Sequence, residues 1–304
     1  MTAPLLYASE VADAIRDRTP VVALESTIIT HGFPWPENLD LARRVEAEVR
    51  AAGAVPATIA VMGGNIRIGL SDDELEALAQ AKDVAKLSRA DLAVCLTQAG
   101  IGATTVAATM ICAHLAGIST FATGGIGGVH KGAETTFDIS ADLRELSETP
   151  VTVVAAGAKA ILDIQKTLEV LETLGVPVIS YGQDDFPAFW SRSAGLPAPL
   201  RMDSAAEIAA SHRMRAALGL RGGQLIANPI PAGDEIPAAD LAPIIRTAQA
   251  EAEAAGITAK QVTPFLLQRI FELTEGRSAK ANTALVLNNA RLAAEIAREI
   301  ITGA

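Results

Sequence analysis

Apolar and polar positions along the chain follow two alternating patterns. Short runs of Val, Ile, Leu and Ala, bounded by Gly, Pro or polar residues, are typical of buried strands. They predict strands at residues 20–24, 58–62, 66–68, 92–96, 118–122, 151–155 and 176–180. Between and after them, apolar residues recur at helical spacing. This spacing predicts helices at residues 37–52, 104–116, 160–174, 205–218, 238–255, 264–274 and 279–301, with a short helix after the capping box that begins at Ser71.

The alternation indicates an α/β fold with a central, largely parallel sheet, helices on both faces and a helical C-terminal part. No change in composition resembles an interdomain linker, so one domain over residues 1–304 is expected. The longest loop, residues 183–200, contains Phe186, Phe189 and Trp190 among several prolines. It is either a lid or a loop packed on the surface.

Composition narrows the class of protein. Half of the 304 residues are apolar and 20% are charged, which excludes a disordered chain and a disulfide-stapled miniprotein. The net charge of −10 argues against nucleic-acid binding, which depends on neutralising phosphates. No Asp, Glu, Lys or Arg lies between Asp91 and Lys131, but glycines and polar residues divide this stretch into segments too short to cross a membrane. The start of the chain has no signal-peptide pattern, and two cysteines in apolar runs indicate a reducing cytoplasm.

Polar residues at the carboxyl ends of strands are the first candidates for chemistry, because ligands of open α/β sheets bind there. Glu25 directly follows the strand at 20–24, where burial should raise the pKa of its carboxyl and suit it to donate a proton. The structural alternative is a carboxylate bonded to loop amides. Lys159 follows the strand at 151–155, at a predicted helix start with almost no charge nearby. It is either a nucleophile towards carbonyl carbon or a lysine reaching solvent, and the helix dipole disfavours the second reading.

Residues 137–142 precede another predicted helix and offer two further candidates. Ser140, Ala141 and Asp142 stand where helix-start amides either bind phosphate or are simply capped by a side chain. Asp138, on the loop side, could hold a largely hydrated Mg²⁺ or Mn²⁺ through one carboxylate. A single carboxylate is a weak metal signal.

Other basic residues and glycines are less specific. Lys86 and Arg89 could supply positive charge to a phosphate, or lie on a solvated surface. The segment that begins Gly100-Ile-Gly102 follows a predicted strand and opens a helix, as a dinucleotide-binding loop does, but it lacks the third glycine and the downstream acidic residue. His130, which follows a glycine run, either bonds a substrate carbonyl or is a structural histidine.

Five blocks of sequence together resemble pseudouridine-5′-phosphate glycosidases: residues 24–32 (LESTIITHG), 123–130 (TGGIGGVH), 136–143 (TFDISADL), 156–159 (AGAK) and 227–231 (ANPIP). The similarity runs from about residue 8 to 302, with no departure at a motif position. It implies an α/β/α fold, a homotrimer, and reversible cleavage of pseudouridine 5′-phosphate to uracil and ribose 5-phosphate. In the opposite direction this activity is that of a pseudouridylate synthase, in the hydro-lyase class.

The resemblance also implies roles for individual residues. Glu25 would be the proton donor, and Lys159 the nucleophile that forms an imine with the sugar. Asp138 would hold one Mn²⁺ ion, partly through water. The substrate contacts that the resemblance implies are Lys86, Val106, His130, Ser140, Ala141, Asp142 and Asn282, the histidine and the asparagine on the uracil side.

Two functions from other classes remain as alternatives. A nicotinamide-dependent dehydrogenase would fit the α/β pattern and the Gly100-Ile-Gly102 segment. A sugar-phosphate-binding regulator would bind ribose 5-phosphate without turning it over. The expected partners are small-molecule substrates and further copies of the chain, rather than nucleic acid or membrane.

Overall fold

The computed structural model describes residues 2–257 and 262–303. Within these residues, eleven strands join into one sheet. The strands are β1 (Leu5–Tyr7), β2 (Val21–Leu24), β3 (Val55–Met62), β4 (Asn65–Ile68), β5 (Ala85–Leu87), β6 (Ile101–Thr104), β7 (Thr120–Ala122), β8 (Thr152–Ala155), β9 (Val178–Tyr181), β10 (Leu200–Met202) and β11 (Gln224–Ala227).

The order of the strands confirms the predicted sheet. Along its main path the order is β1-β4-β3-β2-β7-β8-β11-β9-β10, with β6 paired to both β3 and β5. Among the described strands, all pairs are parallel except β3–β4 and β3–β6. The central strands β2, β7, β8 and β11 are buried along their whole length, as expected where helices cover both faces of a parallel sheet.

Helices enclose this sheet. They are α1 (Ser9–Arg16), α2 (Thr27–His31), α3 (Glu37–Ala51), α4 (Asp72–Gln80), α5 (Leu92–Thr97), α6 (Val106–Leu115), α7 (Ala133–Thr136), α8 (Ala141–Glu148), α9 (Ile164–Thr173), α10 (Ala205–Ala217), α11 (Ala238–Ala254), α12 (Val262–Leu273) and α13 (Arg277–Thr302), with a 3₁₀ turn at Ala232–Asp234. The capping box predicted at Ser71 is present at the start of α4.

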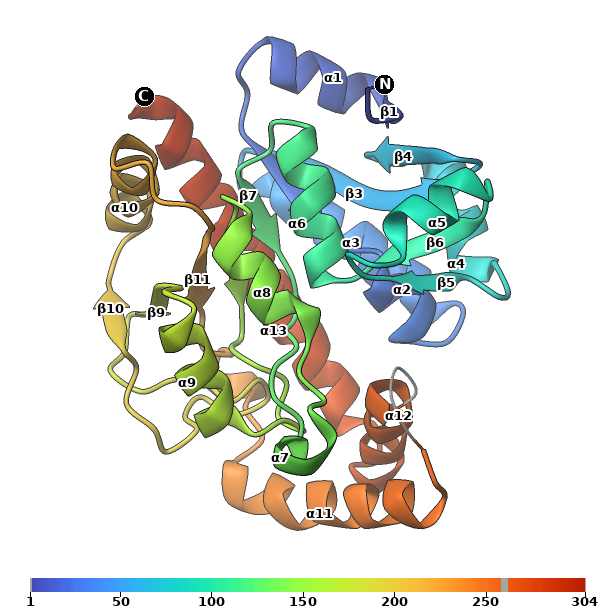
Figure 1. The fold of residues 1–304 in the computed structure, drawn as a ribbon, viewed down its shortest axis with the longest axis vertical. Helices are drawn as coiled ribbons and strands as arrows, with labels where there is room; N and C mark the ends of the chain where they lie inside the picture. The colour runs from blue at the N-terminus through green and yellow to red at the C-terminus, as the bar shows by residue number, and fades with distance from the viewer. Residues whose placement is uncertain (1, 258–261, 304) are drawn as a thin grey trace.

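The helices form two layers, so the architecture is α/β/α as the resemblance implied. The long helix α13 packs against α3 and α10 and on strands β2, β7 and β8. Helix α6 packs on β2, β3 and β7 and against α8, and Figure 1 shows α6 and α8 on the near side of the molecule. Helices α7, α11 and α12 gather together at one end, the lower end in Figure 1.

The prediction of a strand at residues 92–96 was wrong. Leu92–Thr97 is the helix α5, and the strand of this region is β6, Ile101–Thr104. Gly102 lies inside β6, where an added Cβ would come within 2.3 Å of Leu87 Cδ1 on the neighbouring strand. The glycine therefore serves close packing of two strands and not a dinucleotide loop, which removes the motif that suggested a dehydrogenase.

The sequence patterns also missed the strand β11, which lies in the part expected to be helical. In the loop at 183–200, Phe186, Phe189 and Trp190 are all buried, and the rings of the last two meet edge to face at 5.0 Å. These residues pack this loop onto the body of the protein, and the alternative of an open lid does not fit their burial. No helix of the described residues is long and apolar enough to span a membrane.

Candidate active site

The predicted strand-end residues lie together around one cavity of about 300 Å³. Glu25 follows β2, Lys159 lies in the loop after β8, and Lys86 lies on β5. The remaining walls come from the start of α6 and from the loop that leads into α8. The cavity is lined by Glu25, Thr27, Lys86, Ser88, Thr105, Val106, Gly127, His130, Asp138, Ile139, Ser140, Ala141, Asp142, Lys159, Leu162 and Thr263.

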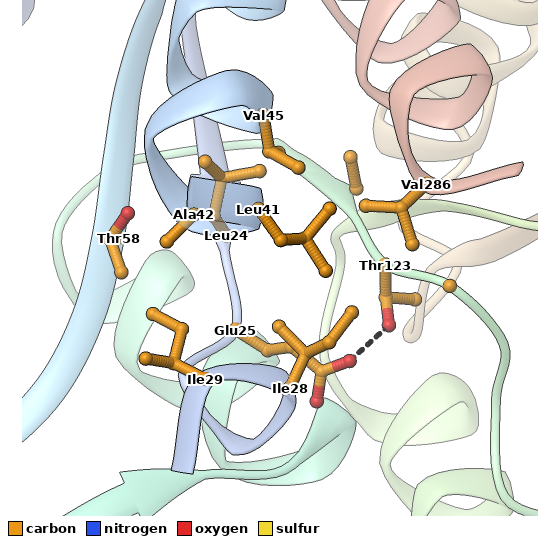
Figure 2. Close-up of a pocket in the computed structure, with 12 residues that line it drawn as sticks. Leu24, Glu25, Ile28, Ile29, Leu41, Ala42, Val45, Thr58, Thr123 and Val286 are labelled. Carbon is orange, nitrogen blue, oxygen red and sulfur yellow. Dashed lines mark hydrogen bonds between the residues drawn. The ribbon is translucent and has the colours of Figure 1, made fainter. Parts of the chain in front are cut away.

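Glu25 stands between this cavity and an apolar wall. Its Oε1 accepts a hydrogen bond from Thr123 Oγ1, at the end of β7. Behind it lies a second, apolar cavity of about 20 Å³, lined mainly by aliphatic side chains of β2, α2 and α3 with Val286 of α13. Figure 2 shows Glu25 and Thr123 joined at the edge of this cavity, with Leu41 and Val45 across it.

This environment sets the protonation of Glu25. Burial raises the pKa of its carboxyl, while the Lys159 ammonium and the hydrogen bond from Thr123 oppose that shift. The expectation of a raised pKa at this strand end is confirmed. A carboxylic acid with a raised pKa is suited to donate its proton.

Lys159 is held by the backbone of a loop, not by a helix. Its N–H donates to Ile126 O at 3.1 Å, and its carbonyl accepts from Leu162 N at 3.0 Å. The prediction of a helix from residue 160 was wrong, because α9 begins at Ile164 after the N-cap Asp163. The helix dipole therefore does not explain the position of Lys159. Its place in the cavity beside Glu25 does.

A third cavity, of about 60 Å³, adjoins the main one and shares Glu25, Lys86 and Lys159 with it. Asn282 of α13 lines this small cavity, and its Oδ1 is buried without a hydrogen-bond partner. Phe189 forms part of the same wall. A flat heterocycle with a donor N–H would satisfy the amide oxygen, because an unpaired buried acceptor costs about 1–3 kcal/mol.

The start of α8 closes the opposite side of the main cavity. Ser140 is the N-cap and accepts from Asp142 N at 3.2 Å, as its position in the sequence predicted. The Asp142 carboxylate accepts from the backbone N–H groups of Gly127 at 2.8 Å and Ala107 at 2.9 Å. Since an added Cβ on Gly127 would lie 2.3 Å from Ser140 Oγ, only glycine allows this approach. Of the three amides at 140–142, the hydrogen bonds of Ser140 N and Asp142 N leave that of Ala141 for an anion.

The two basic candidates behave differently. Lys86 lines both the main and the small cavity. Arg89 lies outside the cavity lining and forms hydrogen bonds with Glu145 at 2.7 and 3.0 Å and with Glu148 at 2.5 Å. The hypothesis that Arg89 supplies charge to a phosphate is therefore wrong, because its guanidinium is engaged with two carboxylates. Val106, the first residue of α6, is buried in the cavity wall.

Asp138 and His130 lie on the side of the cavity nearest α7. His130 N donates to Asp138 O at 3.0 Å, and Nδ1 of the histidine is 4.0 Å from Asp138 Oδ2. Burial lowers the pKa of the His130 imidazole, and the Asp138 carboxylate opposes that shift. Within residues 2–257 and 262–303, no group of three His, Cys, Asp or Glu side chains is arranged to hold a metal. An ion bound at Asp138 would therefore take one carboxylate and have to keep most of its water.

Several lining residues were not singled out from the sequence. Thr123 could have been, because it directly follows β7, as Glu25 follows β2. Thr27 begins α2, and its hydroxyl donates to Thr104 O at 2.6 Å. Thr263, at the start of α12, reaches the site only through the packing of the C-terminal helices, and no local pattern marks it.

Comparisons with known proteins show the family of this chain. The model of the family described as Indigoidine synthase A like protein matches residues 10–299. The pseudouridine-5′-phosphate glycosidase of Jannaschia sp. (strain CCS1) is 72% identical and covers 99% of this chain and 100% of the relative. The one from Paracoccus denitrificans (strain Pd 1222) is 70% identical, over 98% and 99%. The crystal structure of the prealnumycin C-glycosynthase AlnA, in complex with ribulose 5-phosphate, aligns with a TM-score of 0.91 and 39% identity, over 98% of this chain and 97% of that chain. This chain therefore belongs to the Indigoidine synthase A like family, together with relatives named pseudouridine-5′-phosphate glycosidase.

Proposed function

We propose that this protein reversibly cleaves the C–C glycosidic bond of pseudouridine 5′-phosphate, giving uracil and ribose 5-phosphate. The observation that carries this proposal is that Glu25 and Lys159 line both the main and the small cavity. A substrate lying across their junction would present its sugar to both groups. The names of the relatives at 72% and 70% identity support the same substrate.

The chemistry needs an acid and an amine. The leaving atom is carbon, C5 of uracil, so a direct displacement would expel a poor carbanion. Instead, Glu25 gives its proton to the ribose ring oxygen while the neutral Nζ of Lys159 bonds to C1′, and the bond from C1′ to the ring oxygen breaks. The nitrogen bonded to C1′ then loses a proton to the Glu25 carboxylate, which passes it to C5, and the freed nitrogen lone pair of Lys159 forms a C=N bond as the C1′–C5 bond breaks.

In that step the electron pair of the broken bond returns to uracil and restores its C5–C6 double bond. Water then adds to the imine carbon, Lys159 leaves as the free amine, and ribose 5-phosphate is released. The sum is pseudouridine 5′-phosphate plus water giving uracil plus ribose 5-phosphate. In the synthetic direction the same steps run backwards, as for a pseudouridylate synthase of the hydro-lyase class.

The two cavities separate the two ends of the substrate. Lys86 and the Ala141 amide at the start of α8 would bind the phosphate, with Ser140 beside them. Asn282 would bind the uracil ring in the small cavity. This division agrees with the polar lining of the first and the unpaired amide oxygen of the second.

Asp138 would hold one Mn²⁺ ion, largely through water, with His130 next to it. A divalent ion there would supply positive charge to oxygen atoms of the sugar phosphate. The resemblance also implies that the protein is a cytoplasmic homotrimer with one domain per chain. Sedimentation at several concentrations measures the oligomeric state.

Reduction by borohydride tests the imine. With uracil, ribose 5-phosphate and Mn²⁺, the protein should form a phosphorylated nucleoside, and borohydride added during turnover should inactivate it. Peptide mapping should find the ribose phosphate mass on Lys159 and not on Lys86 or Lys166. Lys159→Arg keeps the charge without a usable nucleophile, so it should neither label nor turn over. Binding of ribose 5-phosphate without any turnover would instead support the regulator.

A further inference from the structure

Two buried asparagines adjoin the site without lining it. Asn228 follows β11, in the ANPIP block, and is 4% exposed; Asn289 is in the middle of α13 and is fully buried. Neither residue belongs to the lining of the main or the small cavity. Amides are costly to bury unless they are hydrogen-bonded, so their partners indicate what they do.

The partners lead to the catalytic acid. Asn228 Nδ2 donates to Asn289 Oδ1 at 3.0 Å, and Asn289 Nδ2 donates to Thr123 O at 2.8 Å. A longer hydrogen bond, at 3.4 Å, joins the same nitrogen to Gly124 O. The backbone of Asn228 is fixed in turn, since its N–H donates to Ala155 O at 2.8 Å. The network thus joins α13 to the ends of β7, β8 and β11.

Thr123 is the link between this network and Glu25. Its carbonyl is held by Asn289 and its hydroxyl donates to Glu25 Oε1. A β-branched side chain has few rotamers, so fixing the backbone of Thr123 also fixes the direction of its hydroxyl. The position of the acid therefore depends on a side chain that does not touch it.

Asn289 also fixes the position of α13 along its axis. Asn282 precedes Asn289 by seven residues, about two helical turns, so both side chains lie on the same face of the helix. Asn289 is bonded to the loop at 123–124, and Asn282 reaches the small cavity, which Gly124 also lines. A shift of α13 along its axis would move Asn282 away from Glu25.

We infer that Asn289, supported by Asn228, is a positioning residue: through Thr123 it orients Glu25, and through α13 it places Asn282 against the base. This inference rests on the proposed function. Asn288 provides a contrast, because its Nδ2 donates to Pro229 O, at 3.2 Å, and within the described part of the chain it makes no hydrogen bond to the loop after β7.

The charged groups around Glu25 allow the positioning role of Asn289 to be tested through the pKa of the Glu25 carboxyl as well as through activity. Lys159 from the loop after β8, Asp142 from α8 and Lys86 from β5 act on its carboxyl, and His31 of α2 shares the small cavity with it. The hydrogen bond from Thr123 favours the ionised form of Glu25, so loosening Thr123 should raise the pKa of that carboxyl further.

The experiment compares Asn289→Ala with the control Asn288→Ala in the synthetic direction, using uracil, ribose 5-phosphate and Mn²⁺. We expect kcat to fall about 10-fold to 100-fold in Asn289→Ala, within the range of general acid catalysis. KM for uracil should rise while KM for ribose 5-phosphate stays within about twofold, because the phosphate end lies on the other side of the cavity. The acidic limb of the pH–kcat profile should move to higher pH, because in the synthetic direction Glu25 must be ionised to take the proton of the hydroxyl that closes the ribose ring. Asn288→Ala should match the wild type in kcat, in both KM values and in the pH profile.

If Asn289→Ala does not fold, Asn228→Ser takes its place, since it removes only the support of Asn289 and should show the same changes to a smaller degree. A uniform loss of kcat with unchanged pH limbs and unchanged KM values would overturn the inference, as would identical behaviour of the Asn288 control. Absence of turnover in the wild type would reject the proposed function itself, so the two failures are distinguishable.

Discussion

The guanidinium of Arg89 forms two hydrogen bonds with the carboxylate of Glu145, whose side chain is fully buried. Arg89 follows Lys86 by three residues and Glu145 follows Asp142 by three. The ion pair therefore fixes the distance between the two elements that face the phosphate end of the cavity, β5 and α8. Glu145 also accepts a hydrogen bond from Thr149.

Replacing Arg89 with alanine should destabilise the fold more than it changes phosphate binding. It leaves a buried carboxylate with one neutral partner, which we expect to cost about 1–3 kcal/mol after allowance for the exposure of the arginine. Thermal unfolding measures that loss. If Arg89 contacted the phosphate directly, the variant would instead keep its Tm and lose its preference for a phosphorylated substrate.

Lys86→Ala should weaken phosphate binding more than it destabilises the fold. Pseudouridine without phosphate should be a substrate at least about 100-fold worse than the nucleotide, because two charge-assisted contacts of about 1.5 kcal/mol each are lost. In the variant this gap should narrow, with Tm little changed. Comparing kcat/KM for nucleoside and nucleotide in both proteins tests the assignment. Equal values for the two substrates in the wild type would contradict it.

Glu25→Gln should abolish proton donation while keeping the shape of the side chain. We expect kcat to fall by about 10²–10⁴, the usual contribution of a general acid. The amide oxygen of glutamine can still accept from Thr123, so the loop after β7 should stay in place. Near-normal turnover in this variant would show that Glu25 has a structural role.

Glu25→Gln should also show how much the raised pKa of Glu25 lowers the stability of the folded protein at high pH. Because the native carboxyl holds its proton more tightly than the unfolded one, stability falls as pH rises above the ordinary range of a glutamic acid towards the raised value, and stays lower beyond it. Glutamine has no such loss. The Tm of Glu25→Gln should therefore exceed that of the wild type near pH 8 and match it near pH 4; equal Tm values at both would contradict burial of the charge.

Asp138→Ala tests the metal. Chelation of divalent ions should remove activity from the wild type, and Mn²⁺ should restore it, because one carboxylate holds a hydrated ion reversibly. The variant should resist rescue at Mn²⁺ concentrations that saturate the wild type. Full activity of the wild type in excess chelator would refute the metal site.

The sequence predicted which polar residues gather around the cavity better than it predicted the secondary structure around them. Glu25 could be found because β2 is a continuous apolar run that ends at a carboxylate, and parallel strands bring such ends together. Lys159 was found although the helix start assigned to it was wrong, since the low charge of the segment does not depend on that boundary. Arg89 was misassigned because its partner Glu145 is far away in sequence.

The errors in secondary structure have physical causes. The run at Leu92–Thr97 is apolar like a strand, but the residue before it, Asp91, binds Ser88 N at 2.9 Å and turns the chain into a helix. Strand β11 is only four residues long, so its sequence resembles that of a connecting loop. Its strand conformation depends on pairing with β8 and β9 on either side. Asn289 and Thr263 have no local signal, since their roles arise only when the C-terminal helices pack onto the sheet.

The aliphatic cavity behind Glu25 determines where the acid can exchange its hydrogen with solvent. Thr58, on the far side of that cavity, donates its hydroxyl hydrogen to Glu46, at 2.6 Å, and so has none to offer Glu25. On its other side the carboxyl faces the main and the small cavity, which the substrate would fill. Hydrogen given to the sugar would be replaced from the water that hydrolyses the imine, or after the products leave. In deuterated solvent, label would therefore enter Glu25 once uracil has left and not while the intact nucleotide covers the carboxyl.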